Sequence, residues 1–163
     1  MSFAVHAILI GVGATIVVDL WAIFLKRAFG IPSLDWGMAG RWFGHMPHGR
    51  FLHDGIGRAA PIPGERVIGW TAHYLIGLVF AAVLLAIWGP AWATAPTPLP
   101  ALIVGICTIV APFFIMQPGM GAGIAASKTP APAKARLRSL MTHTVFGIGL
   151  YLSALLWSWL LPA

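Results

Sequence analysis

The chain has 163 residues, of which 59% are hydrophobic and only 9% are charged, and its mean hydropathy is +0.87. Soluble domains carry about 25% charged residues, so a soluble protein of this composition would lack the polar side chains that cover a water-exposed surface. The formal net charge of +6 does not indicate nucleic-acid binding, because the basic residues lie between the apolar stretches and do not interleave with them. The composition therefore predicts a membrane protein with no nucleic-acid partner.

Four apolar stretches are long enough to cross a bilayer, whose hydrocarbon core takes about 20 helical residues. Each must be a helix, because the open edge of a strand would leave backbone groups unsatisfied in lipid. The first stretch lacks a basic start and is too long for a signal peptide, so we expect it to be retained. We therefore predict an all-α, polytopic membrane protein that forms a single domain over residues 1–163. The predicted helices cover residues about 3–28, 67–88, 99–118 and 138–161.

The ten Lys and Arg residues fall in two of the connections between these helices. Six belong to the connection after the first helix, counting Lys26 and Arg27 just before it, and four lie between the third and fourth helices. The N-terminus, the turn at residues 89–98 and the C-terminus hold none. Because cytoplasmic loops carry an excess of Lys and Arg, both basic connections are predicted to be cytoplasmic. The termini are then periplasmic in a bacterial inner membrane.

The two halves of the chain resemble each other weakly. In the first half the matching positions are Leu9-Ile10, Thr15-Ile16-Val17, Gly30-Ile31, Pro61-x-Pro63, Arg66, His73 and Gly77; their counterparts are Leu102-Ile103, Thr108-Ile109-Val110, Gly123-Ile124, Pro130-x-Pro132, Arg136, His143 and Gly147. The identities are few, so chance remains the alternative. We predict two tandem helical hairpins related by a pseudo-two-fold axis along the membrane normal, a parallel repeat. Residues about 33–60 are then an interfacial insertion after the first helix.

Three ionisable residues occur well inside the predicted spans: Asp19, His73 and His143. Such residues are costly in a bilayer and indicate a functional site by default. Each lies seven residues from a basic residue at the cytoplasmic edge, which corresponds to a depth of about 10 Å at the helical rise. We therefore expect the three side chains to converge on one polar site on the cytoplasmic side of the membrane.

Small residues stand one helical turn before and one helical turn after each histidine. Gly77 and Gly147 are the residues one turn after His73 and His143. Small residues at this spacing bring membrane helices into close contact, and they also leave space for a flat ligand beside an imidazole. Both interpretations stay open. If a cofactor binds, His73 and His143 suit the iron of a b-type haem. Together with Asp19 they suit a divalent metal instead.

The insertion after the first helix mixes cations, histidines and aromatic residues. We predict a short interfacial helix here, with Trp36, Trp42 and Phe43 facing lipid and the arginines reaching anionic lipid headgroups. A sharper hypothesis is that this segment binds the phosphate or carboxylate groups of a lipid-like substrate. The residues that would bind them are Arg41, His45, Arg50 and Arg66.

A glycine-rich stretch, Gln117–Gly123, follows the third predicted helix. It is not a nucleotide-binding phosphate loop, because no strand precedes it and the second glycine before Lys128-Thr129 is missing. We predict a helix break here at the cytoplasmic surface, with Pro112 and Pro118 kinking the third helix.

Three motifs together resemble an uncharacterised family of bacterial inner-membrane proteins whose domain has no known function: Gly-Arg-Trp-x-Gly-His at 40–45, Pro-Gly-Glu-Arg-x3-Trp-x2-His-Tyr at 63–74, and the stretch from Gln117 to Pro130. The resemblance covers nearly the whole chain. It implies an inner-membrane location and the four-helix layout, and it implies no activity, substrate or site residues.

The residues by themselves therefore predict a membrane protein that binds a ligand or cofactor at the intramembrane polar site. One alternative is a membrane enzyme that acts on a lipid-like substrate. Another is a proton-coupled transporter subunit, which would have to form a homo-oligomer, because four helices enclose little of a pathway.

Overall fold

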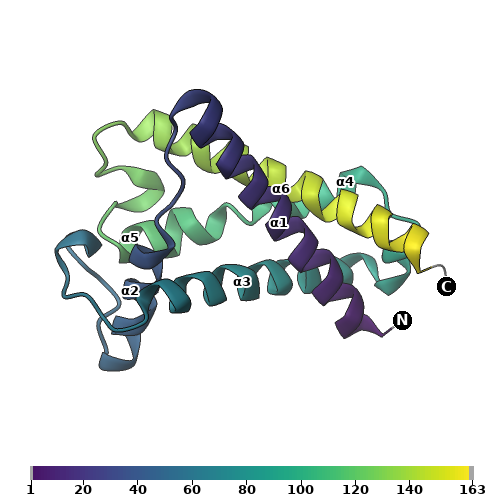
Figure 1. Cartoon of the computed structure of the whole chain (residues 1–163), viewed down its shortest axis with the longest axis horizontal. Coiled ribbons are helices and arrows are strands. Elements are labelled where there is room, and N and C mark those ends of the chain that lie inside the picture. Colours follow the sequence, from purple (N-terminus) through teal and green to yellow (C-terminus); the bar gives the residue numbers. More distant parts are fainter. Residues whose placement is uncertain (1, 162–163) are drawn as a thin grey trace. The chain divides into compact units, whose positions relative to one another are not determined.

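The computed structural model describes residues 2–161, and the described part is helical without strands (Figure 1). Four helical segments are long and apolar enough to cross a membrane: Phe3–Phe29, Glu65–Trp88, Pro98–Gly119 and Pro132–Leu160. The predicted all-α class and the four predicted spans are therefore confirmed. The fourth helix begins earlier than predicted, at Pro132, because proline is well tolerated in the first turn, where its missing N–H is not needed.

Helix α1 (Phe3–Phe29) shows why the first span ends where it does. At its start, the Ser2 hydroxyl accepts a hydrogen bond from the amide of Val5. At its end, Gly30 adopts a left-handed conformation (φ 65°), which glycine reaches without steric cost. The Gly30 amide donates to the carbonyl oxygens of Leu25 and Lys26 and so closes the last turn.

The third span is interrupted, as the prolines predict. It consists of α4 (Pro98–Cys107), a π-helical turn η4 (Pro112–Met116) and the short helix α5 (Gln117–Gly119). Pro112 cannot donate the backbone hydrogen bond that a regular helix needs, and π-turns are a common way to absorb such an interruption.

The chain divides into two compact units. The first holds residues up to 33, Tyr74–Thr108 and the chain from Met141 on, so it contains α1, α4 and most of α3 (Glu65–Trp88) and α6 (Pro132–Leu160). The second holds Leu34–His73 and Ile109–Leu140. Its own elements are α2 (Trp36–His45), η1 (Met46–His48), η2 (Ile56–Arg58), η4, α5 and η5 (Ile124–Ala126).

In the first unit the helices approach one another through glycines. A Cβ atom added at Gly11 of α1 would lie 2.8 Å from the Gly77 carbonyl oxygen of α3. Gly105 of α4 lies against the Gly147 backbone of α6 in the same way, and a Cβ there would clash with it. Helix α1 crosses α6 where Gly149 meets Ala14 (Figure 1). Close backbone contact of this kind is a principal way in which helices associate in a bilayer.

The interior of this unit is apolar, and Ile10, Leu84 and Leu150 are fully buried in it. Its outer surface is apolar as well: Leu20, Val79 and other large aliphatic side chains are exposed along the helices. Such exposure would be unfavourable in water and is expected of a surface that contacts lipid.

The second unit is built around α2. The backbone of α2 meets the start of α3, because a Cβ at Gly40 would clash with the Glu65 carbonyl oxygen and one at Gly69 would clash with the Trp36 carbonyl oxygen. A helix is present where one was predicted, at Trp36–His45, and its interfacial position stays a prediction. The expectation that Trp42 faces lipid is wrong, since its side chain is 5% exposed. The Trp42 indole packs against Gly119 and donates to the Phe51 carbonyl oxygen at 2.9 Å, so neighbouring segments bury it.

Candidate functional site

Asp19 is half-buried on α1, and its carboxylate accepts a hydrogen bond from the Tyr74 hydroxyl of α3 at 2.9 Å. A carboxylate in an apolar span needs such a partner, because an uncompensated charge is strongly disfavoured there. Tyr74 follows His73 directly in the sequence, yet sequence reasoning did not single it out. The structure therefore adds a phenol to the predicted set of polar groups.

His143 of α6 is oriented by Thr108, which directly follows α4. The Thr108 hydroxyl lies 2.6 Å from the Gly105 carbonyl oxygen, to which it donates its only hydrogen. Its oxygen also lies 2.9 Å from Nδ1 of His143, so Nδ1 must carry the proton that joins these two atoms. In a neutral imidazole, Nε2 then holds the lone pair. Thr108 thereby sets the tautomer of His143 and leaves Nε2 as the atom able to accept a proton or bind a metal.

His73 lies in the second unit, in the first part of α3, and its ring stacks on the indole of Trp36. The ring centroids are 3.9 Å apart with an interplanar angle of 24°. Trp70, one turn earlier on α3, makes a second, edge-on contact at 5.7 Å. The imidazole therefore contacts aromatic rings of both α2 and α3.

Asp19 and His143 belong to the first unit and His73 to the second. Across residues 2–161, no group of three or more His, Cys, Asp or Glu side chains is arranged to hold a metal ion. The convergence of the three groups on one ligand stays a prediction.

Gly77 and Gly147 make helix contacts. A Cβ at Gly77 would clash with the Thr15 hydroxyl, and one at Gly147 would lie 2.9 Å from the Ala101 carbonyl oxygen. The space beside each glycine is thus filled by the neighbouring helix. This geometry favours the helix-packing interpretation of the small residues over the space for a porphyrin.

The insertion residues proposed for anion binding differ in what they contact. The Arg41 side chain is 9% exposed and forms a two-pronged ion pair with Glu65 at 2.8 and 2.9 Å. Its third nitrogen donates to the carbonyl oxygens of Ile56 and Ala59. The hydrogen bond to the Glu65 carboxylate raises the pKa of Arg41 above its ordinary value. Arg41 therefore ties α2, η2 and α3 together.

His45 likewise serves the fold, because its Nε2 donates to the Ala60 carbonyl oxygen at 3.0 Å. Arg50 and Arg66 have exposed side chains. Of the four residues predicted to bind headgroups, these two remain the accessible ones.

A cavity of about 510 Å³ opens in the second unit between the segment at residues 52–54 and the glycine-rich loop at residues 118–128. The two walls are joined by hydrogen bonds: the His53 amide and its ring Nδ1 donate to the Gly119 carbonyl oxygen, and the Ile56 amide donates to that of Met120. Gly121 lets the walls meet, since a Cβ there would lie 2.5 Å from the His53 carbonyl oxygen. The cavity is therefore held open by fixed backbone geometry.

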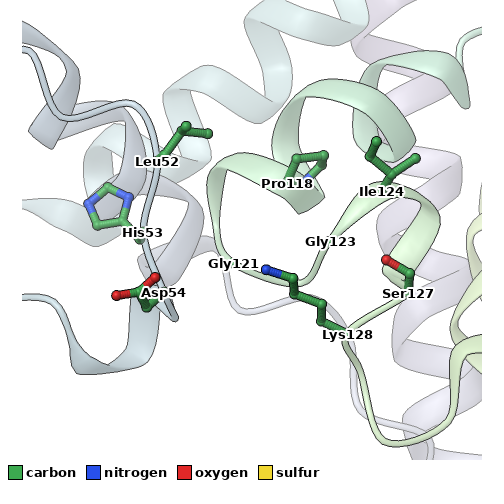
Figure 2. A pocket seen from close by; sticks show the side chains of 9 residues that line it. All are labelled: Leu52, His53, Asp54, Pro118, Gly121, Gly123, Ile124, Ser127 and Lys128. Atoms are coloured by element: carbon green, nitrogen blue, oxygen red, sulfur yellow. The ribbon is translucent and has the colours of Figure 1, made fainter.

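Polar side chains face each other across this cavity (Figure 2). The Lys128 side chain reaches from the loop toward the segment that carries Asp54, and the Ser127 hydroxyl also points inward. Gly123 leaves room for them, because a Cβ there would clash with the Ser127 hydroxyl. Sequence reasoning missed this site. It rejected the glycine-rich stretch as a nucleotide loop, interpreted it as a helix break, and counted Lys128 only as a topology signal.

The loop also carries backbone strain. Ala125 and Ala126 have φ angles of 47° and 60°, in the left-handed region that non-glycine residues rarely adopt. Strained backbone of this kind clusters at ligand-binding sites, where the surrounding structure enforces it.

The apolar outer faces and the four spanning helices define a multi-pass helical membrane protein. Residues 8–157 match the model of a family described as "Protein of unknown function (DUF2938)", and the chain belongs to this family. The match confirms the uncharacterised family that the three sequence motifs indicated. No curated protein and no solved structure matches the chain.

Proposed function

We propose that this membrane protein binds the phosphate group of a lipid headgroup in the cavity of its second unit. The observation that carries the proposal is a cation and a hydroxyl that point into one cavity, two of whose lining residues have unused backbone N–H groups. Lys128 and Ser127 point into it, and Gly123 and Ile124 line it. Within residues 2–161, the amide N–H groups of Gly123 and Ile124 donate no hydrogen bond. Ammonium, hydroxyl and backbone N–H groups are the donors that bind phosphate in proteins.

The source of the phosphate is inferred from the surroundings of the cavity. Both segments that form its walls belong to the basic connections, which the positive-inside rule assigns to the cytoplasmic side. Both wall segments connect in sequence to predicted spans, so we propose that a headgroup enters the cavity while its acyl chains remain in the bilayer. Its volume falls within the range of about 300–1,000 Å³ that is typical of small-ligand pockets.

The experiment compares Lys128→Met with Lys134→Met, two exposed lysines of the same unit, of which only the first lines the cavity. The full chain in detergent is titrated calorimetrically with dihexanoyl phosphatidylglycerol and, separately, with inorganic phosphate. We expect Lys128→Met to weaken lipid binding about tenfold, the equivalent of one charge-assisted hydrogen bond of about 1.4 kcal/mol, and Lys134→Met to leave it unchanged.

Equal losses in the two variants would mean that binding reflects only the general basic charge, and the proposal would be wrong. Binding of phosphate with the same affinity as the lipid would assign the cavity to the free anion and not to a headgroup.

A second candidate is the predicted ligand or cofactor site in the spans, and the orientation of His143 by Thr108 favours it. We propose Nε2 of His143 as the atom that binds the ligand. Haemin titration followed by absorption spectroscopy tests the haem version, with His143→Ala as the variant and His48→Ala, an exposed histidine, as the control. A Soret shift lost only in His143→Ala would support it, and a parent protein that gives no shift would exclude it.

The tandem repeat is also a proposal, and the two hairpins of the first unit support it. Thr15 donates to the carbonyl oxygen of Gly11, and Thr108, its match in the repeat, donates to that of Gly105. Each of these glycines contacts a glycine of the following helix, Gly77 or Gly147, and those two also match. A hydrogen bond from a threonine to a glycine carbonyl oxygen thus recurs in both halves, and it spans four residues in the first half and three in the second.

A further inference from the structure

The two charged side chains that line the cavity lie on opposite walls. Lys128 comes from the loop after η5, and Asp54 comes from the segment before η2 (Figure 2). Within residues 2–161, neither Lys128 nor Asp54 takes part in a salt bridge. A cavity for a simple anion would gain nothing from a carboxylate on its wall, because like charges repel.

Hydrogen bonds hold the backbone of the two segments that carry these charges. The segment that carries Asp54 is tied to α5 by the hydrogen bonds of His53, and the Asp54 carbonyl oxygen accepts a hydrogen bond from Arg58 at 2.7 Å. Lys128 is set by its own amide, which donates to the Ala122 carbonyl oxygen at 2.9 Å. The backbone therefore places one positive and one negative side chain on opposite walls of the cavity.

From this pattern we infer that the ligand is zwitterionic: a phosphodiester joined to a primary amine, as in a phosphoethanolamine headgroup. The phosphate would be bound by Lys128, Ser127 and the free amides of the loop, and the ammonium group would donate to the Asp54 carboxylate. This inference rests on the proposed headgroup binding and adds the class of headgroup. An amine with N–H donors is favoured over a quaternary ammonium, because it adds a charge-assisted hydrogen bond to Asp54 to the charge attraction that both groups share.

The test measures three short-chain lipids on the full chain in detergent: dihexanoyl phosphatidylethanolamine, phosphatidylcholine and phosphatidylglycerol. We expect the parent to bind phosphatidylethanolamine at least fivefold more tightly than the other two. Asp54→Asn keeps the size of the side chain and removes its charge. It should abolish this preference by weakening phosphatidylethanolamine binding, and it should leave phosphatidylglycerol binding equal or tighter.

The possible outcomes distinguish this inference from the proposed headgroup binding on which it rests. If Lys128→Met weakens all three lipids but the parent shows no preference, the headgroup site stands and its zwitterionic selectivity is wrong. If Asp54→Asn weakens all three lipids equally, Asp54 supports the wall and does not bind the amine. If Lys128→Met changes nothing, the headgroup site itself is wrong.

Discussion

Replacing Trp42 tests the arrangement that holds the candidate site. Trp42 is 5% exposed, its indole packs against Gly119 of α5, and its Nε1 donates to the Phe51 carbonyl oxygen. Gly119 also accepts the hydrogen bonds of His53, so Trp42 contacts the region where the two cavity walls are joined. Truncation should therefore loosen both walls.

The size of the effect follows from burial. Replacing a buried Trp by Ala costs about 3–5 kcal/mol, which combines lost apolar contact with the cavity that remains. Trp42→Phe retains most of the apolar contact but leaves the Phe51 carbonyl oxygen without its donor, at a cost of about 1–3 kcal/mol. Trp159 is 79% exposed on α6, so Trp159→Ala is the matched control and should cost less than about 0.5 kcal/mol.

The assay is unfolding of the full chain in mild detergent by added SDS, followed by far-UV circular dichroism and by protease cleavage between residues 46 and 60. Cleavage is included because it reports opening of the second unit specifically, whereas circular dichroism reports the helices of both units. We expect the order Trp42→Ala, Trp42→Phe, Trp159→Ala from the most to the least sensitive. If Trp42→Ala matches Trp159→Ala in both readouts, Trp42 faces lipid as its sequence context suggested, and the packing of α2 described above is incorrect.

Three further predictions concern other parts of the chain. Gly105→Ala should lower the thermal unfolding midpoint in detergent, at a cost of about 1–3 kcal/mol, because its methyl group would meet the Gly147 backbone. Gly57 has open space around it, so the control Gly57→Ala should leave the midpoint unchanged, and equal midpoints for the two variants would contradict the helix contact. Ala125→Gly should raise the midpoint by relieving a φ of 47°, a gain of about 1 kcal/mol, and a lower midpoint would show that the loop is not strained. Reporter fusions at Arg50 and Lys134 should give cytoplasmic signals, and periplasmic activity at either would reverse the proposed topology.

The spans were predictable because the bilayer imposes a local rule. A stretch of about 20 apolar residues must be helical wherever it occurs, so the four helices could be located without knowledge of their neighbours. The interruption at Pro112 was predictable for the same reason, since a missing N–H acts on its own turn. The polar residues Asp19, His73 and His143 could be identified as exceptional, but their partners could not.

The inward and outward faces were decided only by tertiary structure. In lipid an apolar side chain is equally acceptable on either face of a helix, so hydrophobicity does not show that Trp42 turns inward while Trp159 stays exposed. The candidate site was even less predictable from the sequence. His53 and Gly119 are 66 residues apart in the chain, and their hydrogen bond helps to form the cavity that places Asp54 opposite Lys128. Such pairing depends on which backbone groups remain unsatisfied after the helices have formed and on which glycines allow two segments to approach. Neither of these two features can be read from a single stretch of sequence.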